Sequence, residues 1–283
     1  MLKYLIRTFI LFTIMEMTAI VEVAAQHSKC GTTVTPAEVA RQREQPGFGE
    51  MKTLFAPNKC FGKTLSITAH IIADSLGNYG ITPVDITNSL SALNAAFAPI
   101  CIDFELCKVN YIPNYKYNFF LKPTEEAELI SLYAIPKTIN IFYAARVETA
   151  PGSSVGGYAY FPGGPDFIII AKGSLGVITH EMGHFFGLYH TFETQFGLEL
   201  ANGTNCASSG DLVCDTPADP GLGNTPAPDC NLSPYIKDPN NEWYVPMIGN
   251  TMSYYSDDCS CGFTTGQYDR MANKYLNDRF YLW

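Results

Sequence analysis

Eleven residues at positions 180–190 constrain the fold of this chain more than any other stretch. They read His180-Glu181-Met182-Gly183-His184-Phe185-Phe186-Gly187-Leu188-Tyr189-His190. On a helix, His180 and His184 lie one turn apart on the same face, so both imidazoles can bind one metal ion. Gly187 allows the sharp turn that ends the helix and brings His190 round as a third nitrogen ligand. Three imidazoles leave one coordination position of a zinc ion open, which suits catalysis rather than a structural role.

Glu181 follows the first ligand directly and is placed to act as a general base toward a zinc-bound water. The alternative interpretation is a buried amphipathic helix that carries these polar residues without any chemical use. Three of the five histidines of the chain fall within the eleven residues. Because the glycine and the third histidine stand where the metal site needs them, the motif indicates zinc-dependent catalysis.

The first 25 residues have the pattern of a secretory signal peptide. Lys3 and Arg7 precede an apolar run over residues 8–15, and small residues at 23–25 come just before Gln26. A membrane anchor is the alternative, but the run is far shorter than the roughly 20 apolar residues that span a bilayer. We therefore expect cleavage after Ala25 and a secreted, extracellular chain.

The charge balance is acidic, with a formal net charge of −9. Removal of residues 1–25 leaves this value unchanged, because two basic residues are offset by Glu16 and Glu22. An acidic chain without a basic cluster argues against nucleic acid or an anionic membrane as a partner. Peptides or proteins remain as the expected partners of a monomer.

Nine cysteines fit an oxidising compartment. Nine is an odd number, so at least one thiol is free, ligates something or pairs between chains. Their spacing alone does not fix the connectivity.

Residues 26–60 predict an N-terminal extension that serves as a pro-segment. Thr35 is a good helix cap with Pro36 at the first helical position, and the helix should end before Pro46. The rest of the chain, 61–283, predicts one catalytic domain with lobes at 61–187 and 188–283.

The first lobe alternates strands and helices. Apolar patterns predict strands at 65–71, 102–106, 139–143, 155–161 and 166–170, of which the first is half-buried and the fourth lies at a sheet edge. Helical patterns predict helices at 82–97 and 124–133, then the metal helix with Ser174 as its cap. From 191 to about 250, turn residues dominate and periodicity is lost, so loops are expected before a last helix at 265–279.

A methionine turn lies about sixty residues after the zinc motif and reads Asn250-Thr251-Met252-Ser253-Tyr254. Together the two motifs resemble the metzincin clan of metalloproteases. With 184–192 and Gly210-Asp211-Leu212-Val213-Cys214-Asp215-Thr216-Pro217, the chain resembles the pappalysin family, in particular its bacterial secreted members. The resemblance extends to 157–162 and 263–267 and so covers most of 60–280.

This resemblance implies a metzincin-type zincin fold of the α+β class. Its N-terminal part is a mixed twisted sheet with the active-site helix, and its irregular C-terminal subdomain ends in a helix. Met252 would lie beneath the three imidazoles, and Tyr254 would stabilise the oxyanion, unless the register shifts by one to Tyr255. The edge strand at 157–161 would bind the substrate backbone by strand addition, although ordinary sheet is an equal alternative.

Cys30 lies in the pro-segment, and the resemblance suggests that its thiolate occupies the open zinc position as a cysteine switch. A disulfide with Cys60 or another cysteine is the alternative. Activation would require cleavage in a segment whose basic residues are Arg41, Arg43, Lys52 and Lys59.

Resemblance also implies a calcium site and one disulfide. The calcium ligands would be Asp211, the Val213 carbonyl, Asp215 and Thr216, for which plain turn chemistry is the alternative. The disulfide would join Cys206 and Cys230. Cys214 then has Cys259 or Cys261 as a partner, while Cys101 and Cys107 join each other or Cys60.

The sequence thus indicates a secreted zinc endopeptidase that hydrolyses peptide bonds in extracellular proteins. A metzincin of another family is one alternative, and a catalytically silent binding protein is another. Asn202 and Asn231 begin glycosylation sequons. Asp257 and Asp258 follow the methionine turn and would favour a basic substrate residue, unless they form a solvated acidic turn.

Overall fold

The computed structural model describes residues 30–50, 60–221, 230, 235–255, 259 and 261–282. Several expectations from the sequence concern residues outside these ranges, so they remain expectations. They are the signal peptide, Lys52, Lys59, the sequon at Asn231, and the acidic pair Asp257 and Asp258.

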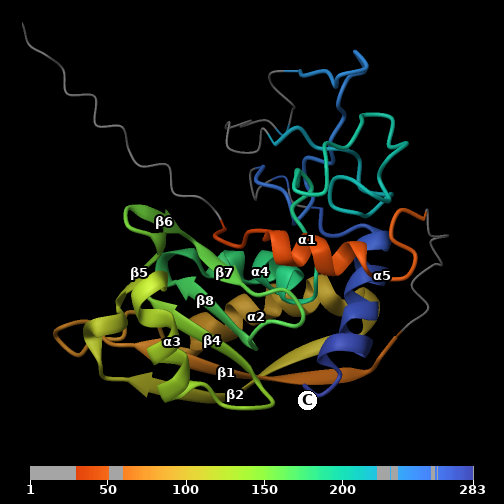
Figure 1. Ribbon diagram of the computed structural model, residues 1–283. Coiled ribbons are helices and arrows are strands. Elements are labelled where there is room, and N and C mark those ends of the chain that lie inside the picture. The colour runs from red at the N-terminus through yellow and green to blue at the C-terminus, as the bar shows by residue number, and fades with distance from the viewer. Residues whose placement is uncertain are drawn as a thin grey trace, which may run out of the picture.

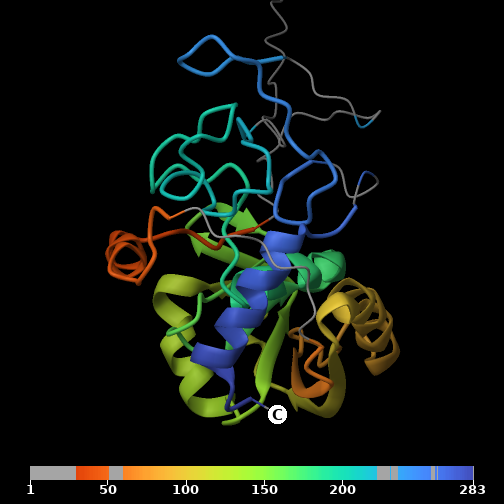
Figure 2. The same ribbon diagram turned by 90° about the vertical axis from the view of Figure 1, so that its right-hand side faces the viewer.

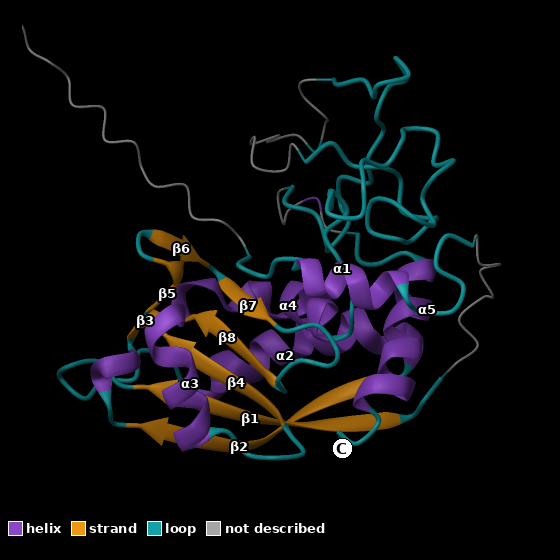
Figure 3. Cartoon of the chain, viewed as in Figure 1, coloured by secondary structure: helices purple, strands orange, loops and turns teal. Residues whose placement is uncertain are grey.

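A five-stranded mixed sheet forms the centre of the first lobe (Figure 1). Its strands, in spatial order, are β2 (Ile102–Ile112), β1 (Lys63–Ile72), β4 (Ile139–Ala144), β8 (Phe167–Ala171) and β7 (Gly157–Ala159). The first four run parallel, and β7 runs antiparallel to β8 at the edge. Figure 3 shows the strands turning progressively across the sheet. The mixed twisted sheet of the expected α+β metzincin-type fold is confirmed.

The predicted fourth strand is divided in the structure. Its first residue, Val155, belongs to β6 (Ser153–Val155). This strand pairs with β5 (Arg146–Ala150), which in turn pairs with β3 (Phe119–Leu121), in a small second sheet. Only Gly157–Ala159 joins the main sheet, as the edge strand that its glycines predicted.

Helices cover both faces of the main sheet. One apolar core lies between the sheet, α2 (Pro83–Phe97) and α4 (Ile178–Phe185), and a second lies on the side of α3 (Lys122–Tyr133). Thr82 and Asp85 close a capping box at the start of α2, which buries Ile86, Leu90, Leu93 and Phe97. The predicted boundaries and apolar face of this helix are confirmed.

Two local predictions were wrong. Strand β1 is not half-buried, because it lies between two strands with helices on both faces and is buried throughout from Ile67 to Ile72. Ser174 does not cap the metal helix, since residues 172–177 form 3-10 turns and Ser174 is non-helical at φ −131°. Gly173 and Gly176 disfavour regular helix there, so α4 begins only at Ile178.

The described residues between 191 and 262 form a loop-rich region above the first lobe (Figure 2). The chain then returns along that lobe as α5 (Thr265–Lys274), which continues as one π-helical stretch, Tyr275–Arg279. Arg279 is fully buried and donates to the carbonyl oxygens of Phe185, at 2.9 Å, and Tyr160, at 3.0 Å. The last helix therefore fixes the end of α4 and the chain that leaves β7.

The N-terminal residues 30–50, which the sequence predicts to be part of a pro-segment, pack against the rest of the chain. The backbone N–H of Gly31 donates to Gly157 O at 2.8 Å, so residues 30–34 run along β7. Helix α1 (Pro36–Arg43) follows, capped by Thr35, whose hydroxyl accepts from Glu38 N at 3.2 Å. The N-terminal helix prediction is confirmed.

Three disulfides occur among the described residues, namely Cys60–Cys101, Cys206–Cys214 and Cys230–Cys259. The expected bridge between Cys206 and Cys230 is therefore wrong, as is the expected pairing of Cys214. Cys206 and Cys214 are eight positions apart in the sequence and their Cα atoms lie 5.1 Å apart, a proximity that spacing alone does not reveal. Cys30 belongs to none of these bridges, and Cys107 and Cys261 are exposed thiols.

Within the described part of the chain, no helix has both the length and the apolar character needed to cross a membrane.

Candidate metal centre

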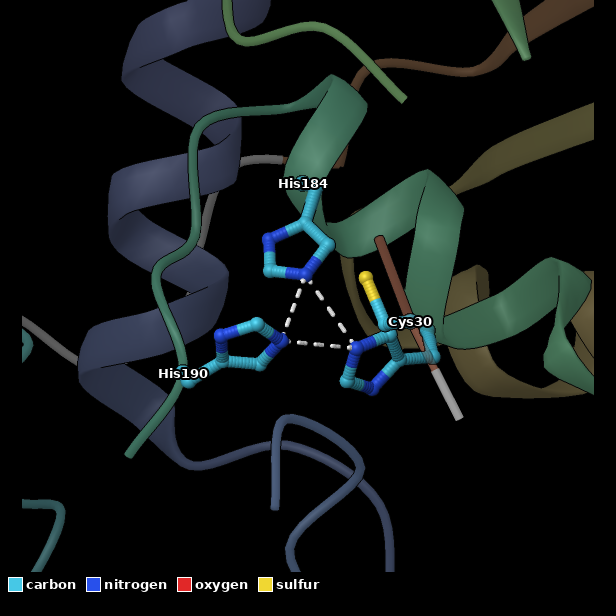
Figure 4. Close-up of side chains that lie close together, drawn as sticks. Cys30, His184 and His190 are labelled. Atoms are coloured by element: carbon cyan, nitrogen blue, oxygen red, sulfur yellow. Dashed lines mark hydrogen bonds between the residues drawn. The ribbon is translucent and has the colours of Figure 1, made fainter. Parts of the chain in front are cut away.

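Three imidazoles converge at the end of α4. The Nε2 atoms of His180 and His184 lie 3.1 Å apart, and that of His190 lies 3.1 Å from His184 and 3.3 Å from His180 (Figure 4). Tetrahedral ligands with Zn–N bonds of about 2.0–2.1 Å are separated by roughly 3.3 Å. The triangle of nitrogens therefore has the size that one zinc ion requires.

In His180 and His184, the hydrogen bond made by Nδ1 determines that Nε2 is the nitrogen available to a metal ion. His180 Nδ1 lies 2.7 Å from Thr251 O, and His184 Nδ1 lies 2.7 Å from Leu188 O. A carbonyl oxygen only accepts, so both Nδ1 atoms carry the proton and both Nε2 lone pairs face the centre. Burial also lowers the pKa of His184 to about 4, which keeps the ring neutral as a ligand must be. Lone pairs gathered this closely fit a cation.

Gly187 makes the turn that delivers His190. Its φ is +88°, and a Cβ there would meet Lys274 Cγ at 2.8 Å. The Leu188 N–H donates to Gly183 O at 2.9 Å and closes the helix. The turn therefore needs glycine for its conformation and for space.

Met252 is fully buried and packs against α4. Gly183 of α4 faces it so closely that a Cβ would lie 2.5 Å from the Met252 sulfur. The turn is held on both sides, because Met252 O accepts from Thr191 N at 3.2 Å and Asn250 exchanges amide hydrogen bonds with Gln267. Gly183 was not identified from the sequence, although its position between the ligands His180 and His184 was an available signal.

Glu181 is completely buried beside the three nitrogens. Its Oε2 accepts from the Cys30 thiol at 3.4 Å and lies 3.2 Å from the Thr32 hydroxyl. On its other side, a Cβ on Gly157 would meet Glu181 Cγ at 3.3 Å and Ile169 O at 2.9 Å. The glycine of the edge strand therefore makes room for the carboxylate.

Two adjacent tyrosines point in different directions. The Tyr254 ring lies 5.0 Å from the His190 ring and 5.9 Å from the His180 ring, and its hydroxyl donates to Cys30 O at 3.0 Å. Tyr255 is buried, with its hydroxyl 3.5 Å from Asp219. Tyr254 is therefore the tyrosine at the metal centre.

Asp219 joins the two halves of the centre and was not identified from the sequence. Its Oδ2 accepts from Thr191 Oγ1 at 2.6 Å and from Ser253 Oγ at 2.7 Å, while Oδ1 accepts from Gly221 N at 2.9 Å. Thr191 follows the third ligand, and Ser253 follows Met252. One buried carboxylate thus fixes both segments, and no motif pattern announced it.

Cys30 completes the surroundings of the histidines. Its sulfur and the three histidine nitrogens all lie within 4.8 Å of one another, and all four residues are buried (Figure 4). Burial, followed by the charge of Glu181, raises the pKa of the thiol well above its usual value. A bound metal ion acts in the opposite direction, since it deprotonates a coordinating thiol.

The expected calcium ligands separate into two groups. The Thr216 hydroxyl lies 2.9 and 3.0 Å from the carboxylate oxygens of buried Asp211 and also contacts Val213 O. Asp215 instead accepts from Thr264 Oγ1 and Gly266 N, both at 2.8 Å, at the N-terminus of α5. The sequence-based set therefore includes one residue that caps a helix.

Glu199, rather than Asp215, lies beside Asp211. A side chain on Gly210 would overlap the Glu199 carboxylate, and Glu199 Oε1 is buried without a hydrogen-bond partner among the described residues. Burial and the neighbouring Asp211 raise the pKa of Glu199 to about 8, and burial raises that of Asp211 to about 7. Two neighbouring buried carboxylates, one of which disfavours the charge of the other, have the donor chemistry of a cation site.

Comparison with known proteins supports the interpretation of this centre. Residues 170–276 match the model of the peptidase M43 family, described as pregnancy-associated plasma protein-A. An extracellular metalloprotease of Colletotrichum graminicola is 31% identical over 87% of this chain and 89% of its own length. A second, from Neurospora crassa, is 29% identical over 74% of this chain and 73% of its own.

The fold is shared with a solved structure of mirolysin, at a TM-score of 0.55 and 20% identity over 75% of this chain and 91% of that one. The sequence relatives named above are fungal, so the expected similarity to bacterial members in particular is not supported. The chain belongs to the M43, or pappalysin, family of metalloproteases.

Proposed function

We propose the following division of roles within this secreted zinc metalloendopeptidase. His180, His184 and His190 bind the catalytic zinc through Nε2. Glu181 is the general base, and Tyr254 is the donor to the oxyanion. The observation that carries the proposal is the convergence of three Nε2 atoms beside a buried carboxylate.

Zinc at this centre would lower the pKa of a bound water to about 7 and polarise the scissile carbonyl. Glu181 takes the proton of the attacking water and passes it to the leaving amine. The Tyr254 hydroxyl donates to the negative charge that develops on the carbonyl oxygen. In the described state that hydroxyl donates to Cys30 O instead, so a bound peptide would have to replace the pro-segment first.

The edge strand β7 is the proposed binding site for the substrate backbone. Gly31 N donates to Gly157 O, and Ala159 N donates to Thr32 Oγ1 at 2.9 Å, so β7 already binds one extended segment. An extended substrate would add to the same edge through its main chain, once the pro-segment has left.

The same contacts support latency. The Cys30 sulfur lies within 4.8 Å of the three histidine nitrogens, where it could serve as the fourth zinc ligand. The Thr32 hydroxyl donates a hydrogen bond to the carboxylate of Glu181. Release requires a cut before Cys60, because the disulfide to Cys101 holds the chain from that point on. Arg41 and Arg43 lie within α1, where a protease cannot bind an extended strand, so the cut falls after the helix.

Calcium is the ion proposed for a second metal site, whose ligands are Glu199, Asp211, the Val213 carbonyl and Thr216. The supporting observation is the pair of buried carboxylates, one with a buried oxygen that lacks a hydrogen-bond partner in the described part of the chain. Oxygen donors of this kind suit a hard cation.

The decisive experiment replaces Glu181 with glutamine in the processed protein. We expect one zinc per chain by metal analysis and loss of peptide cleavage by at least about a thousandfold, because the base is removed and the ligands are kept. A His190→Ala variant is the matched control and should lose zinc as well as activity. Cleavage by Glu181→Gln at the wild-type rate would refute the assignment.

A further inference from the structure

A small apolar cluster joins the pro-segment to the catalytic domain. On the domain side lie Phe161, Tyr189 and Phe196, with Leu212 packed against them, and we call these four residues the apolar patch. From the pro-segment, Val34 is buried in the cluster, and Val39 and Phe48 pack against it. This cluster is separate from the two cores that hold the sheet and helices together.

The apolar patch begins at the metal centre. The Phe161 ring meets the His184 ring edge-on at 5.6 Å and the Tyr189 ring at 4.9 Å, and Tyr189 meets Phe196 at 5.0 Å. Phe161 also lies two residues beyond the end of β7. The patch therefore begins beside His184 and just beyond the end of β7.

The pro-segment covers the patch tightly at one end only. Val34 is 9% exposed, whereas a cavity of about 450 Å³ remains farther along, bordered by Phe48 and Leu212. The best-formed contact is thus the one nearest the metal. There, a single side chain of an extended segment fills the space beside Phe161 and Tyr189.

Release of the pro-segment would uncover the apolar patch beside an open catalytic groove. Adjacent exposed aromatic side chains on a soluble protein mark a binding surface. Its rim is polar, because the Arg270 guanidinium lies 4.6 Å from the centre of the Tyr189 ring and the Tyr189 hydroxyl, which contacts Glu38, would be freed. An apolar floor with a polar rim suits one apolar side chain of a peptide.

We infer that the apolar patch is a substrate subsite of the processed enzyme, which selects an apolar residue about four positions from the bond that is cut. The distance follows from the pro-segment, in which Val34 lies four residues from Cys30 at the metal centre. The inference rests on the proposed function, since it assigns a specificity to the same groove.

The test uses the full chain, folded and then cut by limited proteolysis ahead of Cys60. Two sets of quenched fluorescent peptides carry valine or aspartate four positions from the cleaved bond, one set on each side of it. We expect one side to show a valine preference of about tenfold in kcat/KM, the size that burial of one apolar side chain provides. Equal cleavage of the valine and aspartate peptides on both sides would overturn the inference.

Phe196→Ala tests the patch itself, and Leu198→Ala is the matched control, because Leu198 is 46% exposed and lies outside the cluster. Phe196→Ala should raise KM for the valine peptide five- to tenfold, with kcat unchanged and the aspartate peptide unaffected. Leu198→Ala should change neither peptide. Equal effects of Phe196→Ala on both peptides would indicate a merely structural role and contradict the subsite.

Calorimetry separates this inference from the proposed function. Glu181→Gln protein, cut in the same way, should bind the valine peptide about tenfold more tightly than the aspartate peptide without cleaving either. If wild-type protein cleaved no peptide but this difference in binding remained, the catalytic proposal would fail and the subsite would stand. If a peptide of residues 30–44 bound but substrates showed no preference, the patch would serve only the pro-segment and the inference would fall.

Discussion

Gly183 and Met252 are in direct contact, so close that a Cβ on the glycine would lie 2.5 Å from the methionine sulfur. Because Gly183 sits between the ligands His180 and His184, the methionine turn can reach the underside of the zinc motif only while this position lacks a side chain. The packing of the two motifs depends on that missing methyl group.

Gly183→Ala should therefore destabilise the protein by about 1–3 kcal/mol through overpacking, and weaken zinc binding with it. Thermal unfolding and a chelator competition measure the two effects. Gly173→Ala, where nothing lies within 4 Å of the new Cβ, is the control. A Gly183→Ala/Met252→Ala double variant should recover part of the loss, and strictly additive losses would show that the contact does not matter.

Sequence patterns were most informative where chemistry or a cap requires specific residues. The zinc motif gave all three converging imidazoles, and Thr82, Pro83 and Asp85 gave the start of α2. The metal helix begins later than Ser174 predicts, because Gly173 and Gly176 on either side of the serine disfavour regular helix.

Contacts between distant segments were not predictable in the same way. Cys206 pairs with Cys214 rather than Cys230, and Asp219 and Glu199 reach their partners through loops without any periodic pattern. Such loops acquire their shape from many weak local preferences, so their residues can be assigned only when the chain is seen folded.

Asp219→Ala should lower zinc affinity roughly tenfold to a hundredfold, because such supporting hydrogen bonds orient the ligands of a metal. The cobalt-substituted protein should also show a shifted visible spectrum. Asp219→Asn keeps one acceptor oxygen, so its zinc affinity should lie between those of wild type and Asp219→Ala. Asp238→Ala serves as the control, since this buried carboxylate accepts from the backbone N–H groups of Ala201, Asn240 and Glu242, away from the metal motif, and its loss should affect stability alone.

Glu199→Gln should abolish any rise in melting temperature that calcium produces, because one of the two charged ligands is lost. Asp215→Asn, at the helix cap, should lower the melting temperature equally with and without calcium. Differential scanning fluorimetry measures the melting temperature of each variant with calcium and with magnesium. Loss of the calcium response in Asp215→Asn but not in Glu199→Gln would restore the ligand set expected from the sequence.

His70 predicts a pH dependence of stability. Its ring is fully buried, with Nε2 2.9 Å from Asn140 Oδ1 and Nδ1 3.1 Å from the Asn110 amide, and burial lowers its pKa from 6.5 to about 4. The unfolded chain binds the proton more readily, so stability is complete above pH 6.5 and declines as the pH falls toward 4. The decline should amount to about 3 kcal/mol.

Urea unfolding of zinc-loaded protein between pH 7 and 4 measures this decline. A His70→Gln variant starts from a lower stability but should lose about 3 kcal/mol less over the same range, since its amide does not titrate. Identical pH slopes for the two proteins would show that other groups control the acid response.

Cys30→Ser should relieve latency while leaving the pro-segment bound. Cys30 shares the metal centre with the three histidines, but Thr32, Glu38 and Val34 provide further contacts that remain. We therefore expect the unprocessed variant to cleave peptides at least about tenfold faster than wild type, yet slower than the processed enzyme, as expected when a strong thiolate ligand is lost.

Cobalt-substituted wild type should show a thiolate charge-transfer band that Cys30→Ser lacks. Cys107→Ser, which removes an exposed thiol on β2, should retain both the band and the latency. Absence of the band from cobalt-substituted wild type would mean that the Cys30 sulfur does not reach the metal, and latency would then depend on the strand pairing along β7 alone.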